Sequence, residues 1–310
     1  MDAKDVRIFC EMAFKGLDYD SFTDRRVSPL AIGRKLGLDE KTVRVRVKKM
    51  EDDGFIKYYQ AVPNLALFGM KVVSSYRLEA LNITTKHRVV ENVQQIPYVI
   101  EATDYLGQSV ALTIAGASAN EIEQVAGQIV NRFELTKIFL GGSQVREPPF
   151  HPEKLDWQIF QYLRYDALCS IKELAQELSI TPRMAEYRIA KLLNSGTLLI
   201  RAVINSQKQE GLIFYELEML VEEARQFGVV TKLGDIYGEK LWSVHTSSGG
   251  VLRANLFGFN LAEPEDAVVK ALELEGVKAC TLLIFKETVE PGRPNWMDEL
   301  IEQKISSRPS

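Results

Sequence analysis

The chain has 310 residues, 46% of them hydrophobic and 26% charged, with a net charge of −4, which is the composition of a globular protein of two or three domains. Its three cysteines (Cys10, Cys169 and Cys280) stand far apart, which argues against a disulfide framework or a cysteine-based zinc site and indicates a reducing cytoplasm. No apolar run approaches the roughly 20 residues that cross a bilayer, and the acidic start predicts no signal peptide, so we expect no membrane partner.

The first elements of the chain predict a helix-turn-helix. Apolar residues between Leu30 and Leu36 indicate a short helix, which Ser28 can cap and Gly37 ends. An acidic, polar loop at residues 16–27 precedes this helix, and we assign it no function. Asp39 is a good N-cap for a second helix, which Gly54 ends.

The second of these helices carries positive charge on one face. Val43, Val47 and Met50 recur at i, i+4 and i+7 and form its apolar stripe. A cationic face is often only solvated surface, but a helix, a glycine turn and a basic helix in this order are typical of DNA binding. The residues expected to contact DNA are Lys41, Thr42, Arg44, Arg46, Lys48 and Lys49. The alternating run 55–62 predicts a strand that would supply a wing.

Strand and helix patterns follow in the order βαββαβ, which is the ferredoxin-like arrangement. We expect a strand at Lys71–Glu79, a helix at Thr84–Gln95, two strands within Val99–Ile114, a helix at Ala119–Phe133 and a strand at Lys137–Val145. A proline-rich linker, Pro148–Pro152, then precedes a second copy of the whole pattern.

The second copy repeats the first at recognisable positions. Residues 5–9 return as 156–160, and Thr42–Ile56 aligns without a gap on Met184–Leu198. Its own βαββαβ pattern is expected in Ile213–Val221, Glu223–Ile236, two strands within Trp242–Phe259, Glu263–Leu274 and Cys280–Val289, with a short helix in the tail at Asn295–Lys304. The predicted fold class is therefore α+β, with two winged helix-turn-helix domains alternating with two ferredoxin-like βαββαβ domains. The predicted boundaries are 1–62, 63–147, 148–205 and 206–290, with a C-terminal tail at 291–310.

The second recognition helix is less basic than the first. The residues expected to contact DNA on it are Arg183, Tyr187, Arg188 and Lys191. Glu186 stands where the first copy has Arg44, and its charge would repel phosphate, so we expect weaker DNA binding here or a change to protein contacts. Both copies keep an arginine (Arg46, Arg188) and a first-helix aspartate, so an Arg–Asp pair between helices explains these arginines as well as DNA contact does.

The first copy resembles the Lrp/AsnC family of transcription regulators. The resemblance rests on Leu36-Gly37-Leu38, Thr42-Val43, Arg46-Val47, Met50-Glu51, Gly54 and Ile56. It implies a sequence-specific regulator of double-stranded DNA that assembles into homo-oligomers through its βαββαβ sheets. Because family members usually carry one such unit per chain, two units here would make a covalently linked pseudo-dimer.

The resemblance also implies a small-molecule effector near the turn between the second and third strands of the sensing domain. The corresponding residues are Asp104, Gly107, Ser248 and Gly249. A turn rich in glycine and aspartate needs no ligand to explain it, so the structural interpretation stays open.

Two alternatives come from other classes of protein. Siroheme decarboxylases resemble Lrp and use His and Arg near the second and third strands, where this chain has His245 and Arg253. Because one His and one Arg are more often surface residues, we expect no enzyme, no catalytic residue, no metal site and no cofactor. The other alternative is an architectural protein that binds DNA without sequence preference.

Overall fold

The computed structural model describes residues 1–13, 28–93, 95–205, 208, 211–247, 249–289 and 294–307. The loop at 16–27 and Ser248, both named above, therefore lie outside the described residues. The chain forms two compact units, each assembled from separate segments. One contains Met1–Ala3, Val72–Ser143 and Gln209–Pro291, and the other contains Lys4–Lys71, Gln144–Lys208 and Gly292–Ser310. We call them the sheet unit and the helix-turn-helix unit.

In the helix-turn-helix unit, the first copy contains α1 (Ala3–Ala13), α2 (Pro29–Leu36), α3 (Glu40–Asp52), β1 (Ile56–Pro63) and the 3-10 turn η1 (Leu65–Phe68). Ser28 caps α2, and Gly37 ends it with a φ of 67°, a backbone conformation that favours glycine. Gly33 permits the tight turn between the helices, because a Cβ there would lie 2.6 Å from the carbonyl oxygen of Leu38.

The second copy contains α6 (Lys154–Leu163), α7 (Ile171–Glu177), α8 (Pro182–Asn194) and β6 (Leu198–Ile204). Ser170 caps α7 in a capping box with Glu173, as its place before the helix predicts. The tail forms α11 (Trp296–Ser306), which packs against α6. The tail is therefore an integral part of this unit.

The strand predicted as a wing exists, but its partner differs from that of a wing hairpin. β1 pairs antiparallel with β6 of the other copy, and the two make a sheet of their own. Tyr59 lies opposite Ala202 and Gln60 lies opposite Arg201, while the repeat makes Tyr59 equivalent to Arg201 and Gln60 equivalent to Ala202. A register that exchanges equivalent residues in this way has a local two-fold axis at its centre.

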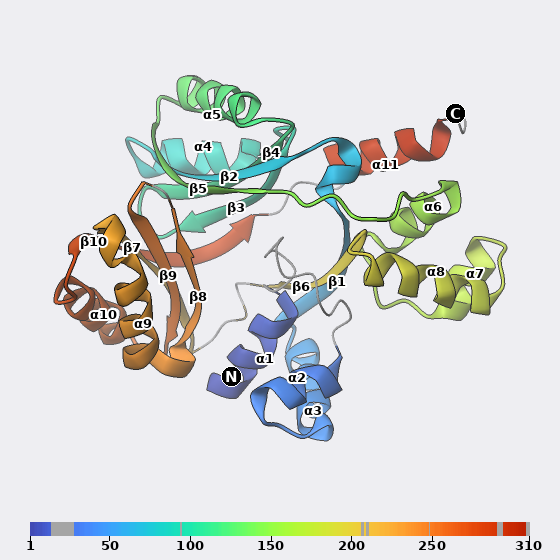
Figure 1. The fold of residues 1–310 in the computed structure, drawn as a ribbon, viewed down its shortest axis with the longest axis horizontal. Coiled ribbons are helices and arrows are strands. Elements are labelled where there is room, and N and C mark those ends of the chain that lie inside the picture. The colour runs from blue at the N-terminus through green and yellow to red at the C-terminus, as the bar shows by residue number, and fades with distance from the viewer. Residues whose placement is uncertain are drawn as a thin grey trace. The chain divides into compact units, whose positions relative to one another are not determined.

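The sheet unit contains both βαββαβ repeats (Figure 1). The first comprises β2 (Val72–Glu79), α4 (Ile83–Val93), β3 (Val99–Tyr105), β4 (Ser109–Gly116), α5 (Ala119–Phe133) and β5 (Thr136–Gln144). The second comprises β7 (Ile213–Val221), η3 (Glu223–Arg225), α9 (Gln226–Tyr237), η4 (Gly238–Lys240), β8 (Leu241–Thr246), β9 (Val251–Gly258), α10 (Ala262–Leu272) and β10 (Val277–Val289).

The eight strands form one sheet in the order β5-β2-β4-β3-β10-β7-β9-β8. Within each half of this order, the last strand of the repeat lies beside its first strand, and its second strand lies at the other end of the four. This is the strand order of the ferredoxin-like arrangement. β10 joins the halves, because Val277–Ile284 pairs with β7 and Phe285–Val289 pairs with β3. The predicted fold class is confirmed.

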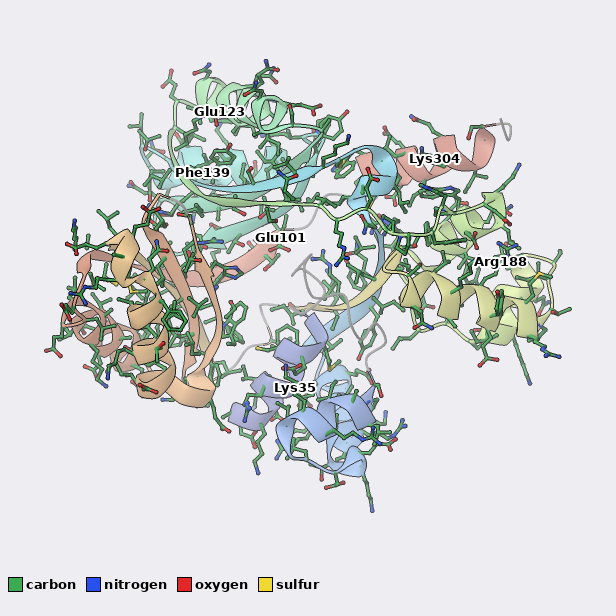
Figure 2. The ribbon with its side chains drawn as sticks, in the orientation of Figure 1. Lys35, Glu101, Glu123, Phe139, Arg188 and Lys304 are labelled. Atoms are coloured by element: carbon green, nitrogen blue, oxygen red, sulfur yellow. The ribbon has the colours of Figure 1, made fainter. Side chains whose placement is uncertain are left out.

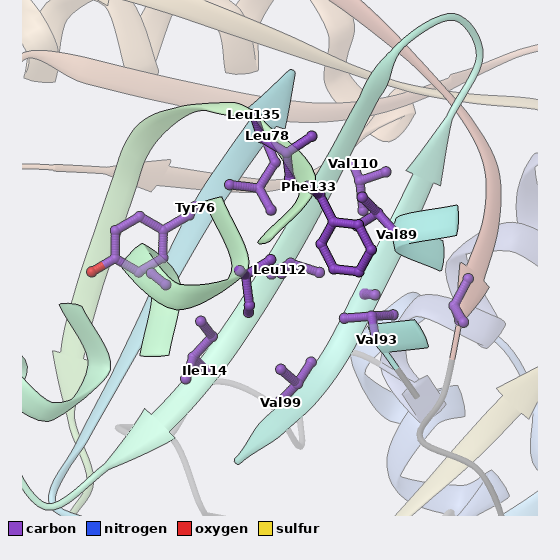
Figure 3. Close-up of a cluster of buried hydrophobic side chains, with 14 of the residues drawn as sticks. Tyr76, Leu78, Val89, Val93, Val99, Val110, Leu112, Ile114, Phe133 and Leu135 are labelled. Carbon is purple, nitrogen blue, oxygen red and sulfur yellow. The ribbon is translucent and has the colours of Figure 1, made fainter. Parts of the chain in front are cut away.

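Each half of the sheet buries an apolar face under its own helices. Figure 3 shows the first core, where Leu112 and Ile114 of β4 meet Val89 of α4 and Phe133 of α5. The second core packs strand residues such as Leu217 against α9 and α10 in the same way. These two cores account for the alternating apolar pattern of the strands.

The opposite, helix-free faces of the two half-sheets pack against each other. Leu140 of β5 is buried with Tyr105 of β3 and Leu283 of β10, and a Cβ on Gly141 would lie 3.4 Å from the Cβ of Ser247. The sheet surfaces that the sequence predicts for assembly between chains are thus occupied within one chain. None of the helices that the structure describes is long and apolar enough to span a membrane.

Candidate nucleic-acid interface

The helix α3 is built to present one face outward. Asp39 begins it by accepting the amide of Thr42 at 2.8 Å, and the hydrogen bonds from Thr42 lower the pKa of this carboxyl. Val43 and Met50 are fully buried against the rest of the domain. Its exposed residues are Lys41, Arg44, Val45, Lys48 and Lys49, followed in the last turn by Glu51 and Asp52. The apolar stripe therefore orients four cations and one small apolar side chain toward solvent.

Two of these cations form ion pairs within the helix. Arg44 lies 2.5 Å from Glu40, and Lys48 lies 3.1 Å from Asp52. The side chains of Arg44 and Lys48 are 63% and 73% exposed, and such i,i+4 pairs contribute only a few tenths of a kcal/mol. Exchange of these partners for phosphate or a base edge is therefore inexpensive. Thr42 is half-buried, and its hydroxyl donates to Asp39 at 2.5 Å.

Arg46 occupies a different position from its neighbours. It is half-buried, and its guanidinium lies 2.7 Å from Asp5, which joins α3 to α1. In the second copy Arg188, which is labelled in Figure 2, lies on α8. Its guanidinium is 2.9 Å from Asp156 and 2.9 Å from Glu153, which joins α8 to the start of α6. The Arg–Asp pair between helices is thus observed in both copies. A DNA contact by either arginine remains a prediction.

The second recognition helix, α8, exposes a different set of side chains. Arg183, Met184, Glu186 and Tyr187 all face solvent, with Tyr187 67% exposed. Lys191 lies over the ring of Phe150 in the linker, 3.8 Å from its centroid, so its charge is engaged in a cation–π contact. The geometry brings all ten predicted DNA-contact residues onto α3 and α8, but the cationic face belongs to α3.

The predicted effector residues lie in two separate turns. Asp104 is fully buried, with Lys86 2.7 Å from one carboxylate oxygen and Lys286 2.8 Å from the other. The hydrogen bond to Asp104 raises the pKa of Lys286. Gly107 has a φ of 88° in the β3–β4 turn, which explains it without a ligand. Gly249 lies in the β8–β9 turn, and Ser248 lies outside the described residues. Effector binding at these positions remains a prediction.

Sequence reasoning missed a group of buried charges between the helix-free faces. Arg77 of β2 binds Glu218 of β7 through two hydrogen bonds of 2.8 Å, and Glu216 lies 3.6 Å from Arg253. Burial raises the pKa of Glu216. The available signal was the alternation of acids in β7, whose sequence Glu216-Leu217-Glu218 places both carboxyls on the face away from the helices.

The residues considered for decarboxylase chemistry also lie on this side of the sheet. His245 of β8 stands directly opposite Arg253 of β9, so both side chains project from the same face. His245 is exposed, and Arg253 is partly buried beside Glu216. Within the described part of the chain, no three His, Cys, Asp or Glu residues come together as a metal site.

Two segments of the chain, residues 23–57 and 152–198, match the family described as winged helix-turn-helix DNA-binding. Among solved structures, the siroheme decarboxylase NirDL is similar over 98% of both chains at 15% identity, with a TM-score of 0.54. The same enzyme in co-complex with an iron-uroporphyrin III analogue gives 14% identity, 98% coverage of both chains and a TM-score of 0.53.

AsnC from E. coli is similar at 14% identity over 44% of this chain and 92% of that chain, with a TM-score of 0.36. No curated protein matches the sequence. The segment matches place two DNA-binding winged helix-turn-helix domains in the chain, and the NirDL likeness shows a shared fold over the whole length. The matches do not show that the two copies arose by duplication, so this origin remains a prediction.

The expectation that the chain is not an enzyme is wrong, because the comparison with NirDL keeps an enzyme possible. A chain with this fold from end to end is described as a decarboxylase, so the architecture does not separate regulators from enzymes. The expectation relied on the argument that one His and one Arg near the second and third strands are more often surface residues than catalysts. That reasoning failed because fold and chemistry vary independently.

Proposed function

We propose that the protein is a transcription regulator that binds double-stranded DNA and reads it mainly through α3. The observation that carries the proposal is the exposed face of α3, where Lys41, Arg44, Lys48 and Lys49 surround Val45. A helix of this kind fits the major groove, where Arg recognises guanine edges, Lys neutralises phosphate and an apolar side chain contacts the thymine methyl group.

The strand pairing in the helix-turn-helix unit supports recognition of two half-sites. β1 and β6 relate the two copies by a local two-fold axis, and two-fold-related recognition helices bind half-sites about 10 bp or a multiple apart. Arg44 and Glu186 occupy equivalent positions, so the two half-sites would differ. The proposal is therefore an asymmetric, imperfectly palindromic site. Such a regulator works in the cytoplasm, where it has access to the chromosome.

The test is selection from a randomised duplex pool by the wild type and by Arg44→Ala/Lys48→Ala, at two salt concentrations. The control, Arg132→Ala/Lys270→Ala, removes two exposed positive charges from α5 and α10 and so matches the change in net charge. The proposal expects an enriched motif that the control retains and the α3 variant loses. Binding without enrichment would favour an architectural role, and no binding by the wild type would refute the proposal.

The second candidate is a tetrapyrrole enzyme related to siroheme decarboxylase. The observation in its favour is that His245 and Arg253 project side by side from β8 and β9 in a chain that shares the NirDL fold. His245 would hold the iron or supply a proton, and Arg253 would bind a propionate group of the tetrapyrrole. Titration with an iron uroporphyrin tests it. A Soret shift that His245→Ala/Arg253→Ala abolishes would support this function, and an unchanged spectrum would contradict it.

A further inference from the structure

The two βαββαβ repeats can be aligned residue by residue through β4 and β9. Both strands have eight residues and end in a glycine, Gly116 or Gly258. In both, a glutamate on the following helix, Glu121 or Glu263, accepts the backbone amide of the residue after that glycine, at 2.7 and 3.3 Å. A loop-to-helix contact that recurs at the same spacing makes Gly116 and Gly258 equivalent positions.

This alignment makes Arg77 and Glu218 equivalent positions. Arg77 of β2 lies opposite Ala111 of β4, and Glu218 of β7 lies opposite Arg253 of β9. Ala111 and Arg253 are each the third residue of their eight-residue strand, and are therefore equivalent. The residues opposite them in the first strand of each repeat must also be equivalent. The two repeats thus carry opposite charges at one shared position.

The structure brings these equivalent residues into direct contact. Arg77 Nε donates to Glu218 Oε2 at 2.8 Å, and a terminal nitrogen of Arg77 donates to Oε1 at 2.8 Å. The side chains are only 7% and 9% exposed. When residue i of one repeat touches the equivalent residue i of its partner, the contact lies at the local two-fold axis of the pair. Arg77 and Glu218 therefore occupy the axis of the sandwich.

A charged pair at this position distinguishes partners by sign. If two first repeats from different chains packed through the same faces, two arginines would meet at the axis, and two second repeats would bring two glutamates together. Buried like charges are strongly unfavourable, whereas a bidentate Arg–carboxylate pair satisfies both groups. Apolar residues would pack here without such discrimination, since buried ion pairs add specificity more readily than stability.

We propose that the Arg77–Glu218 pair selects heterotypic pairing, so that a first repeat accepts a second repeat as its partner and rejects a copy of itself. This inference rests on the fold of the sheet unit and is independent of DNA binding. Covalent linkage favours the intrachain partner through effective concentration, but it does not forbid pairing between identical repeats of different chains. The Arg77–Glu218 pair makes pairing between identical repeats unfavourable.

Neighbouring contacts hold the arginine in the geometry that this selection requires. Glu79 forms a second ion pair with Arg77 and also accepts the hydroxyl of Ser109 at 2.7 Å. Arg77 is thus held by a carboxylate of its own repeat as well as by Glu218 of the other. A rigid, pre-oriented guanidinium discriminates more sharply than a mobile one, because it cannot swing away from a second arginine.

The first test uses charge reversal in the full chain. Arg77→Glu and Glu218→Arg should each place like charges on the axis and lower the midpoint of thermal unfolding by roughly 5 °C or more. The double variant Arg77→Glu/Glu218→Arg should recover most of this loss, because opposite charges meet again. Arg88→Glu, on an exposed position of α4, is the control and should leave the midpoint unchanged.

The second test separates partner selection from simple stabilisation. Chains carrying Arg77→Glu and chains carrying Glu218→Arg are unfolded in urea, mixed in equal amounts and refolded together. Only pairing between the two kinds of chain brings opposite charges onto the axis, so native mass spectrometry should detect a mixed two-chain species. Recovery of stability in the double variant without any mixed species would overturn the proposal.

A neutral variant keeps the proposal testable if the single reversals do not fold. Arg77→Met/Glu218→Leu preserves volume and removes the charges, so the chain should fold with a similar midpoint. Light scattering should then detect association between chains that the wild type does not show at equal concentration, because identical repeats are no longer rejected. A distribution of species identical to that of the wild type would overturn the proposal.

Discussion

Arg44 and Arg46 of α3 show how one residue type serves two purposes on one helix. Arg44 is exposed and available, whereas Arg46 is held by Asp5 and Arg188 by Asp156. The aspartate partners were suggested by their recurrence in both copies, and the structure contains both ion pairs.

Removal of Asp5 should therefore lower the stability of the protein. We expect Asp5→Ala to lower the free energy of unfolding by about 1–3 kcal/mol, since it leaves the half-buried charge of Arg46 without this hydrogen-bonded partner. Urea unfolding followed by circular dichroism measures the change. Asp52→Ala, which removes the exposed partner of Lys48, is the control and should change stability by less than about 0.5 kcal/mol.

Because the carboxyl of Glu216 is buried, we expect the stability of the protein to depend on pH. Because burial raises the pKa of this carboxyl in the folded state, its stabilising contribution is present below the unfolded pKa and is lost as pH rises through the folded pKa. Gln resembles the protonated acid. We therefore expect Glu216→Gln to match the wild type near pH 4.5 and to become progressively more stable than the wild type toward pH 8.

The measurement is urea unfolding of both proteins across this pH range. Glu273→Gln, at an exposed position after α10, is the control, and its difference from the wild type should stay constant with pH. A constant difference for Glu216→Gln as well would contradict the raised pKa.

At the scale of elements, local signals identified most helices and strands but not all of their partners. Caps and glycines predicted both helices of the first helix-turn-helix, because those signals act within one or two turns, and the alignment of the copies predicted those of the second. The alternating run after α3 predicted β1, yet its pairing with β6 joins residues more than 130 positions apart. No local pattern encodes such a partner, so the sequence predicted the strand but not the strand with which it pairs.

The tail helix α11 gives an element-scale prediction. Asp298 accepts hydrogen bonds from the buried Arg164 at 3.0 Å and from the hydroxyl of Tyr165 at 2.6 Å. We expect Asp298→Ala to lower the free energy of unfolding of the helix-turn-helix unit by about 1–3 kcal/mol and to increase hydrogen exchange in α11. Glu302→Ala, on the exposed face of the same helix, is the control. Unchanged exchange in α11 would show that these bonds do not hold it.

At the scale of the whole molecule, the sequence predicted the repeated architecture, since periodicity and the recurrence of motifs survive low similarity between the copies. The resemblance implied a covalently linked pseudo-dimer, but it did not predict that the two helix-turn-helix domains join into one unit through the pairing of β1 with β6. Glu216, Glu218 and Arg77 lie on strand faces that a single repeat would expose, so their charges looked ordinary in the sequence. Only the pairing of the two repeats buries them.

The presence of two copies in one chain allows the two recognition helices to differ. α3 keeps an exposed cationic face, whereas α8 presents Glu186 and Tyr187 and has Lys191 engaged on Phe150. If one copy supplies most of the affinity for DNA, the recognition helix of the other can make weaker or different contacts while the unit keeps its fold. The division of binding energy between α3 and α8 is therefore the central claim.

The most direct measurement is the affinity of the wild type, Arg44→Ala and Arg183→Ala for one duplex enriched in the pool selection, by fluorescence anisotropy at two salt concentrations. We predict that Arg44→Ala loses about 1–3 kcal/mol of binding free energy, or roughly fivefold to 150-fold in affinity, and that Arg183→Ala loses much less. Equal losses for the two variants, or no loss for Arg44→Ala, would contradict the assignment of DNA reading to α3.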